Sequence, residues 1–146
     1  NSVAAYEKYG GPLIIVDFGT AITFDVVSRK GEYLGGAIAP GVQLSLEALF
    51  ENAAKLPRVE LTDPRHVIGK STVESVHSGT IHGFASLIDG MVSKIQAELD
   101  QKARVIATGG TVGLIVSLSN SIDITDPFLT LEGLRIIHQR NQRDDT

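Results

Sequence analysis

The residues best suited to chemistry in this chain follow a short apolar run near its start. Residues 15–25 read IVDFGTAITFD, which predicts a buried strand, a turn at Gly19 and a second strand. A glycine lets a ligand approach the backbone closely, the turn amides and Thr20 can donate to phosphate oxygens, and the Asp17 carboxylate can hold a cation. The segment therefore indicates a phosphate and cation site. The competing interpretation is a structural hairpin in which Asp17 and Thr20 only form the turn.

A second glycine break, Gly109-Gly110, follows a predicted strand over residues 104–108 and precedes an apolar helix. Such a break suits a nucleotide, although a simple strand-to-helix turn has the same pattern. If the strands over residues 13–18 and 104–108 are parallel neighbours, both glycine breaks lie beyond the same edge of the sheet. Ligands of α/β sheets bind at that edge, so the two breaks together predict one binding crevice.

Two further candidates belong to a long helix that begins near residue 71. Ser71 and Glu74 form a capping-box pattern at its start. Thr72 lies beside them, and it either contacts a substrate carboxylate drawn to the helix N-terminus or serves as the cap itself. Asp89 lies among apolar residues within the helix, which predicts that it is buried with a partner or placed at an interface.

The composition is that of a single soluble globular domain, because 42% of the 146 residues are hydrophobic and 21% are charged. The net charge of −4, without a cluster of Lys and Arg, argues against nucleic acid as a partner. No cysteine is present, which excludes disulfides and thiolate metal sites and fits a reducing cytoplasm. The four histidines lack metal-ligand spacing, and neither a membrane span nor a signal peptide is evident, so no membrane partner is expected.

The elements that must position these residues follow a recognisable order. Three extended segments form a meander, and helices and strands then alternate. This is the order of a ribonuclease-H-like α/β fold, whose mixed sheet combines an antiparallel edge with a parallel part. The predicted helices cover residues 3–9, 44–56, 71–99, 111–118 and 130–139, the predicted strands cover residues 13–18, 21–28, 33–38, 104–108 and 122–125, and residues 57–70 are predicted to be a surface segment.

Seven short motifs along the chain resemble, in order, those of the type III pantothenate kinases, which belong to the actin-like ATPase superfamily. They are residues 17–25 (DFGTAITFD), 35–41 (GGAIAPG), 69–72 (GKST), 78–79 (SG), 88–90 (IDG), 108–110 (TGG) and 126–134 (DPFLTLEGL). The resemblance covers essentially the whole chain but only the C-terminal half of that family. It implies that residues 1–146 are a single ribonuclease-H-like domain, the C-terminal half of a two-domain kinase.

The resemblance also implies roles for individual residues. Asp17 would bind the activating monovalent cation, potassium or ammonium, and Thr72 would contact pantothenate. The catalytic base would be the Asp of a Gly-Ala-Asp-Arg motif upstream of Asn1, so no catalytic residue is expected within this chain. ATP would be bound with magnesium by residues of the two glycine breaks, namely Gly19, Thr20, Gly109 and Gly110.

The function implied by the resemblance is phosphorylation of pantothenate by ATP, the first step of coenzyme A biosynthesis. Because the base and half of the ATP cleft would be absent, this chain alone is expected to be inactive. The resemblance further implies a homodimer. The alternatives are a non-enzymatic accessory or transcription-associated member of the same family, and another ATPase or sugar kinase of the superfamily.

Overall fold

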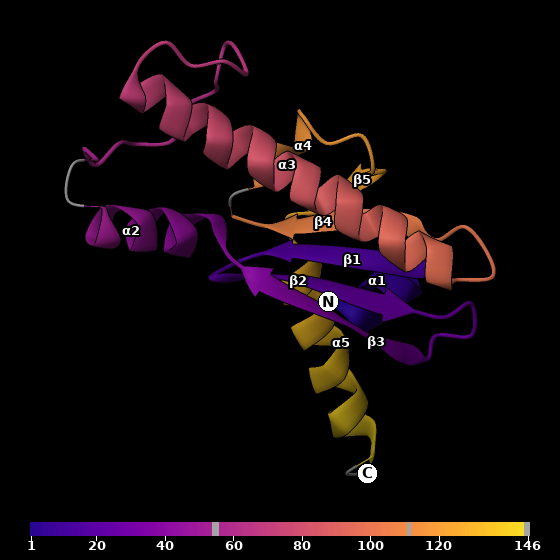
Figure 1. Cartoon of the computed structure of the whole chain (residues 1–146). Coiled ribbons are helices and arrows are strands. Elements are labelled where there is room, and N and C mark those ends of the chain that lie inside the picture. The colour runs from indigo at the N-terminus through magenta and orange to yellow at the C-terminus, as the bar shows by residue number, and fades with distance from the viewer. Residues whose placement is uncertain (54–55, 111, 145–146) are drawn as a thin grey trace.

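The computed structural model describes residues 1–53, 56–110 and 112–144, and within them it shows a five-stranded mixed sheet with helices on both faces (Figure 1). The strand order is β3-β2-β1-β4-β5. β1 pairs antiparallel with β2 and β2 with β3, whereas β1 with β4 and β4 with β5 are parallel. The strands are β1 (Leu13–Phe18), β2 (Ala21–Val27), β3 (Tyr33–Pro40), β4 (Arg104–Gly109) and β5 (Ile124–Thr125). This topology confirms the predicted meander followed by a parallel part.

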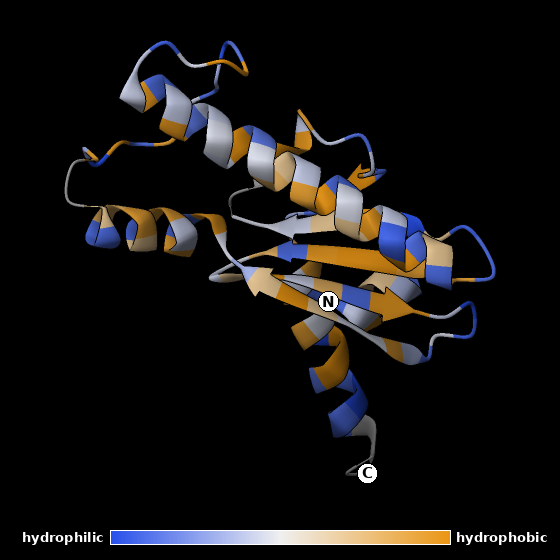
Figure 2. Cartoon of the chain, in the orientation of Figure 1, coloured by the Kyte–Doolittle hydropathy of each residue, from blue (hydrophilic) through white to orange (hydrophobic). Residues whose placement is uncertain are grey.

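β1 is the central strand because its sequence, LIIVDF, is apolar on both faces until Asp17. Figure 2 shows hydrophobic residues along most of β1, whereas the turn between β2 and β3 is hydrophilic. One face of β1 contributes Ile14, Val16 and Phe18 to the larger core cluster. Its other face contributes Leu13 and Ile15 to a second cluster. Asp17 shares the face of Leu13 and Ile15, because side chains alternate along a strand.

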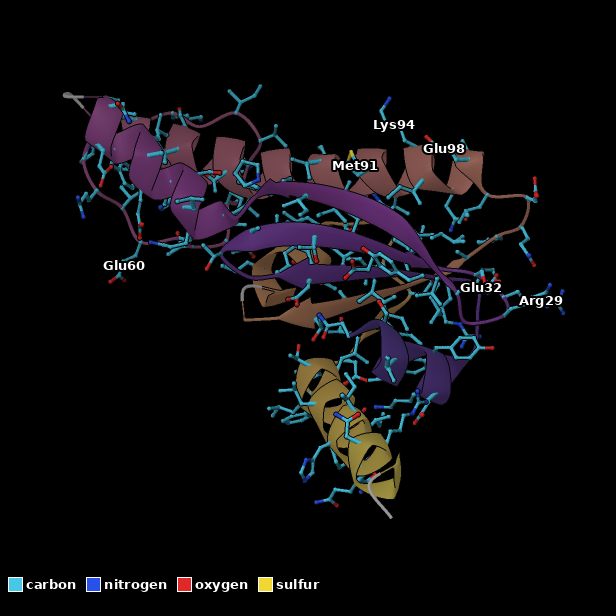
Figure 3. The ribbon with its side chains drawn as sticks, turned by 90° about the horizontal axis from the view of Figure 1, so that it is seen from below. Arg29, Glu32, Glu60, Met91, Lys94 and Glu98 are labelled. Carbon is cyan, nitrogen blue, oxygen red and sulfur yellow. The ribbon has the colours of Figure 1, made fainter. Side chains whose placement is uncertain are left out.

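The helices divide between the two faces of the sheet. The larger core lies under α3 (Thr72–Glu98), with α2 (Val42–Asn52) and α4 (Val112–Val116) on the same side. α1 (Ser2–Tyr9) and α5 (Leu129–Asp144) cover the face that carries Asp17. Figures 1 and 3 both show α3 on one side of the sheet and α5 on the other. Within the described residues no helix combines the length and apolar character that crossing a membrane requires.

α1 and α5 are joined by polar contacts between the two ends of the chain. Lys8 Nζ lies 2.7 Å from Asp126 Oδ2, just before α5, and Arg140 pairs with Glu7. Tyr9 donates a second 2.7 Å hydrogen bond to the same Asp126 oxygen. Asp126 is almost fully buried. Burial by itself raises the pKa of Asp126, but the hydrogen bonds from Lys8 and Tyr9 outweigh it and hold the pKa below its usual value.

The predicted elements all exist, and their boundaries differ in places. α2 begins at Val42 and ends at Asn52, earlier at both ends than predicted, and residues 54–55 of the predicted helix lie outside the described part of the chain. β3 continues to Pro40, which an edge strand tolerates because one side of it needs no backbone donor. β5 keeps only Ile124–Thr125 of the predicted four residues. α5 extends to Asp144, five residues further than predicted, and its extension carries the Arg140–Glu7 pair.

Candidate functional site

The parallel pairing of β1 with β4 brings the two glycine breaks to one edge of the sheet. Phe18 is the register partner of Gly109, and Asp17 is the partner of Thr108. Gly109 has φ 106°, and a Cβ there would lie 2.4 Å from the Phe18 carbonyl oxygen, so only glycine fits. The predicted convergence is therefore correct. This edge and the β2–β3 turn lie at opposite ends of β2. Figure 3 shows Arg29 and Glu32 at the β2–β3 turn.

The turn between β1 and β2 is held in place by the segment that leads into α2. Gly19 N donates to Ala21 O at 3.0 Å, and Gly41 N donates to Thr20 O at 3.0 Å. A Cβ at Gly41 would lie 2.3 Å from Thr20 O, so this close approach requires glycine at position 41. A Cβ at Gly19 would meet only Ala21 O, at an ordinary 3.5 Å. The fold itself therefore has room for a side chain at the exposed position 19, and space above that turn is open to a ligand.

Asp17 is half-buried at this edge and is held by Asn1, a residue that no sequence motif indicates. Asn1 Nδ2 donates to Asp17 Oδ2 at 2.6 Å, and Thr130 Oγ1 donates to Asn1 Oδ1 at 2.7 Å. The amide of Asn1 thus links the carboxylate to the first turn of α5. One hydrogen bond leaves a carboxylate with further acceptor positions, which a cation can use.

Thr108 lies next to Asp17 in the sheet. Thr108 is 1% exposed, and its hydroxyl oxygen has no hydrogen-bond partner in the described part of the chain. The sequence contained a signal for this residue, since it immediately precedes Gly109 on the strand predicted to neighbour β1. No group of three or more His, Asp or Glu residues suited to a metal occurs among the described residues. The side-chain oxygens that could bind a cation at this edge are those of the Asp17 carboxylate and the neighbouring Thr108 hydroxyl.

Thr72 is not brought into contact with these strand ends. It starts α3 and lines a cavity of about 470 Å³ between α2 and α3, whose apolar wall includes Leu46, Leu49 and Phe84. Ser71 is the helix cap, because its hydroxyl accepts from Glu74 N at 3.2 Å. Glu74 Oε2 accepts from Lys70 N at 2.7 Å rather than from Ser71, so the capping box is shifted by one residue. Thr72 itself is exposed and is not the cap.

Asp89 is held by partners within the chain, which is the first of the two alternatives that the sequence predicts. It is half-buried and accepts hydrogen bonds from the hydroxyls of Ser119 and Ser121, both at 2.6 Å, and from the amide of Asn120. Burial raises the pKa of Asp89, but these hydrogen bonds outweigh it and keep the pKa low. Asp25 accepts from the Tyr33 hydroxyl at 3.0 Å. Asp89 is thus occupied by structural partners, whereas Asp25 pairs with Ile15, two residues before Asp17 on β1.

The chain is similar in sequence to proteins of one family. A family model described as type III pantothenate kinase matches residues 1–94. A relative named type III pantothenate kinase in Moorella thermoacetica is 58% identical over 141 residues, and one in Myxococcus xanthus is 55% identical. Each alignment covers 97% of this chain but only 56% or 55% of the relative. The chain therefore spans about half the length of the curated relatives it matches.

Solved structures share the fold. A Campylobacter jejuni protein described as a Baf-family transcriptional activator superposes with a TM-score of 0.66 at 22% identity, over 97% of this chain and 63% of that one. The activator of 2-hydroxyisocaproyl-CoA dehydratase from Clostridium difficile gives a TM-score of 0.51 at 10% identity, over 99% of this chain and 67% of that one. At these identities the likeness concerns the fold alone, and it agrees with the predicted ribonuclease-H-like fold.

Proposed function

The chain belongs to the type III pantothenate kinase family, and from this premise we propose that it forms the C-terminal domain of an enzyme that phosphorylates pantothenate with ATP. The observation that carries the proposal is the register of Phe18 with Gly109, which sets two glycine turns at one edge of the sheet. Phosphoryl transfer depends mainly on positioning and on neutralising charge, and backbone amides of such turns serve both needs.

We assign the phosphates of ATP, with their magnesium ion, to the β1–β2 turn. The exposed backbone at Gly19 and Thr20 supports this assignment, because the fold leaves room for a ligand above position 19. The adjoining Gly109-Gly110 turn would accept the remainder of the nucleotide. Magnesium, when bound, would neutralise phosphate charge.

We assign the monovalent cation, potassium or ammonium, to Asp17. The support is a half-buried carboxylate that one amide orients and that lies beside an unpartnered hydroxyl. These residues fit a cation with oxygen ligands, since the carboxylate retains acceptor positions after binding Asn1. The ion would supply positive charge next to the phosphates.

Thr72 is proposed to contact pantothenate. The cavity it lines is mostly apolar, and its polar lining residues include Ser45 and Thr80. Pantothenate carries both a dimethyl group and a carboxylate, and this combination of surfaces suits both. The N-terminus of α3 adds a favourable field for the carboxylate.

We also propose that the protein is a homodimer and that it functions in the cytoplasm. The dimer is supported by an exposed apolar stripe on and just before α5, formed by Phe128, Leu131, Leu134 and Ile137 at three-residue spacing. Such stripes are usually covered by another protein surface. Light scattering on the chain after size exclusion should give twice the mass of the 15.6 kDa monomer, and a monomer at high concentration would contradict the dimer.

A chimera tests the function directly. In it, residues 1–146 of this protein replace the matching segment of the Moorella thermoacetica relative. We expect the chimera to convert pantothenate and ATP to phosphopantothenate and ADP within about tenfold of the rate of the parent, because the segment is 58% identical. The 146-residue chain alone should show no turnover, since it spans only 56% of that relative. A folded chimera without activity would favour a non-enzymatic role.

A further inference from the structure

One buried polar atom remains without a partner at the edge of the sheet that carries the candidate site. Thr108 Oγ1 is inaccessible to solvent and makes no hydrogen bond with any described residue. Buried hydroxyls in folded proteins are nearly always paired, because leaving one unpaired sacrifices its bonds to water. Such an exception calls for a ligand or ion that supplies the missing interaction.

The position of Thr108 identifies its nearest charged neighbour. Thr108 and Asp17 are register partners on the adjacent parallel strands β4 and β1, so their side chains point to the same face. Neighbouring strands lie roughly 4.8 Å apart, a separation that one ion can span with two oxygen ligands. The Thr108 hydroxyl nevertheless makes no hydrogen bond to the Asp17 carboxylate, which accepts instead from Asn1.

We propose that Thr108 Oγ1 is a second ligand of the monovalent cation at Asp17, an inference that rests on the cation site of the proposed function. A hydroxyl oxygen can accept through two lone pairs, and threonine presents it on a stiff, β-branched side chain. The carboxylate provides charge, and the hydroxyl provides a neutral oxygen at a fixed place. Thr108 would thereby help to hold the ion at the face of the sheet from which Asp17 and Thr108 both project.

The test is thermal unfolding of the 146-residue chain, followed by circular dichroism, in potassium chloride and in choline chloride at equal ionic strength. Potassium bound to the folded chain should raise the melting temperature by about 3 °C or more once its concentration exceeds the dissociation constant several-fold. Thr108→Val should lose this shift. Its melting temperature in choline chloride should equal or exceed that of the parent, because the substitution removes an unpaired buried hydroxyl. Thr108→Ser, which keeps the oxygen, should retain the shift.

Two further variants separate the inference from the cation site itself. Thr125→Val, on the exposed face of β5, should behave as the parent does in both salts. Asp17→Asn should lose the potassium shift.

If Thr108→Val keeps the full shift while Asp17→Asn loses it, Thr108 is not a ligand and the Asp17 site stands alone. A parent chain that responds to neither potassium nor ammonium removes both the ligand role and the cation site. A Thr108→Val chain that melts lower in choline chloride, with Thr108→Ser insensitive to potassium, shows that the hydroxyl is structural.

Discussion

Asn1 Nδ2 lies 2.6 Å from Asp17 Oδ2, and this hydrogen bond joins α1 to the carboxylate at the end of β1. The other end of the same amide accepts from Thr130 at the start of α5. The candidate cation ligand is therefore oriented by two helices that pack against the sheet, rather than by its own turn. This arrangement gives Asn1 a measurable role.

Asn1→Ala should lower the free energy of unfolding of the chain by about 1–3 kcal/mol, because a half-buried carboxylate loses a charged hydrogen bond. Urea unfolding measures the change. Asn52→Ala is the matched control, since the exposed Asn52 donates to the Ala48 carbonyl of its own helix, and it should cost less than about 0.5 kcal/mol. Equal effects of the two substitutions would show that the Asn1–Asp17 hydrogen bond adds no stability.

Asp17→Asn in the chimera should abolish activation by potassium or ammonium. The amide keeps the size and part of the hydrogen bonding of the carboxylate but removes the charge that attracts the ion. Initial rates measured over a range of potassium concentrations check this. Asp25→Asn, on the neighbouring strand, should leave the potassium response intact, because Asp25 pairs with Ile15, two residues before Asp17 and further from the β1–β2 turn. Full cation activation in Asp17→Asn would make Asp17 a turn residue.

Thr72→Ala in the chimera should raise the KM for pantothenate by up to roughly tenfold, the effect of losing one neutral hydrogen bond of about 0.5–1.5 kcal/mol. The KM for ATP and the melting temperature should change little, because Ser71 is the cap of α3. Thr72→Ser should restore most of the affinity. Ser71→Ala provides the contrast, with a stability loss of about 1 kcal/mol. A drop in melting temperature with unchanged pantothenate kinetics would remove Thr72 from the site.

Asp126→Asn should destabilise the chain at pH 7 by about 1–3 kcal/mol, because the buried carboxylate that Lys8 and Tyr9 share would be lost. The pKa of Asp126 in the folded chain lies below the unfolded value of about 3.8. Its stabilisation is thus complete above pH 4 and is lost as the pH falls through the folded pKa. Urea unfolding at pH 7 and pH 3 should show the difference from the parent shrinking in acid. Asp100→Asn, at an exposed position, should show no such trend.

Local sequence patterns predicted most of the fold. The apolar run that ends at Asp17, the glycine breaks and the alternation of helix and strand periods each fix structure over a few residues, and β1 was predicted with its observed bounds. The convergence of Gly19 and Gly109 followed because parallel neighbours end at the same edge. The start of α2 was missed because the periodicity of its apolar residues is clearest only after the first turn.

Contacts between distant residues were not predictable in the same way. Asn1 carries no local sign of its bond to Asp17, and neither Lys8 nor Tyr9 indicates Asp126 as a shared acceptor. These pairs depend on how α1 and α5 pack, which no periodicity encodes. Thr108 is the intermediate case. The predicted strand pairing concerned only the glycine breaks, and both the register that sets Thr108 beside Asp17 and its lack of a hydrogen-bond partner became visible only in the structure.

The contacts between α1 and α5 impose an order on folding. Lys8 and Asp126 are 118 residues apart in sequence, and Asn1 and Thr130 are 129 apart. Closing so long a loop costs entropy before any contact repays it, so this helix pair should dock after the β1–β2–β3 meander has formed. During synthesis, α1 must wait until α5 has left the ribosome. The face of the sheet that carries Asp17 is consequently the last to be shielded from water, and from other nascent chains.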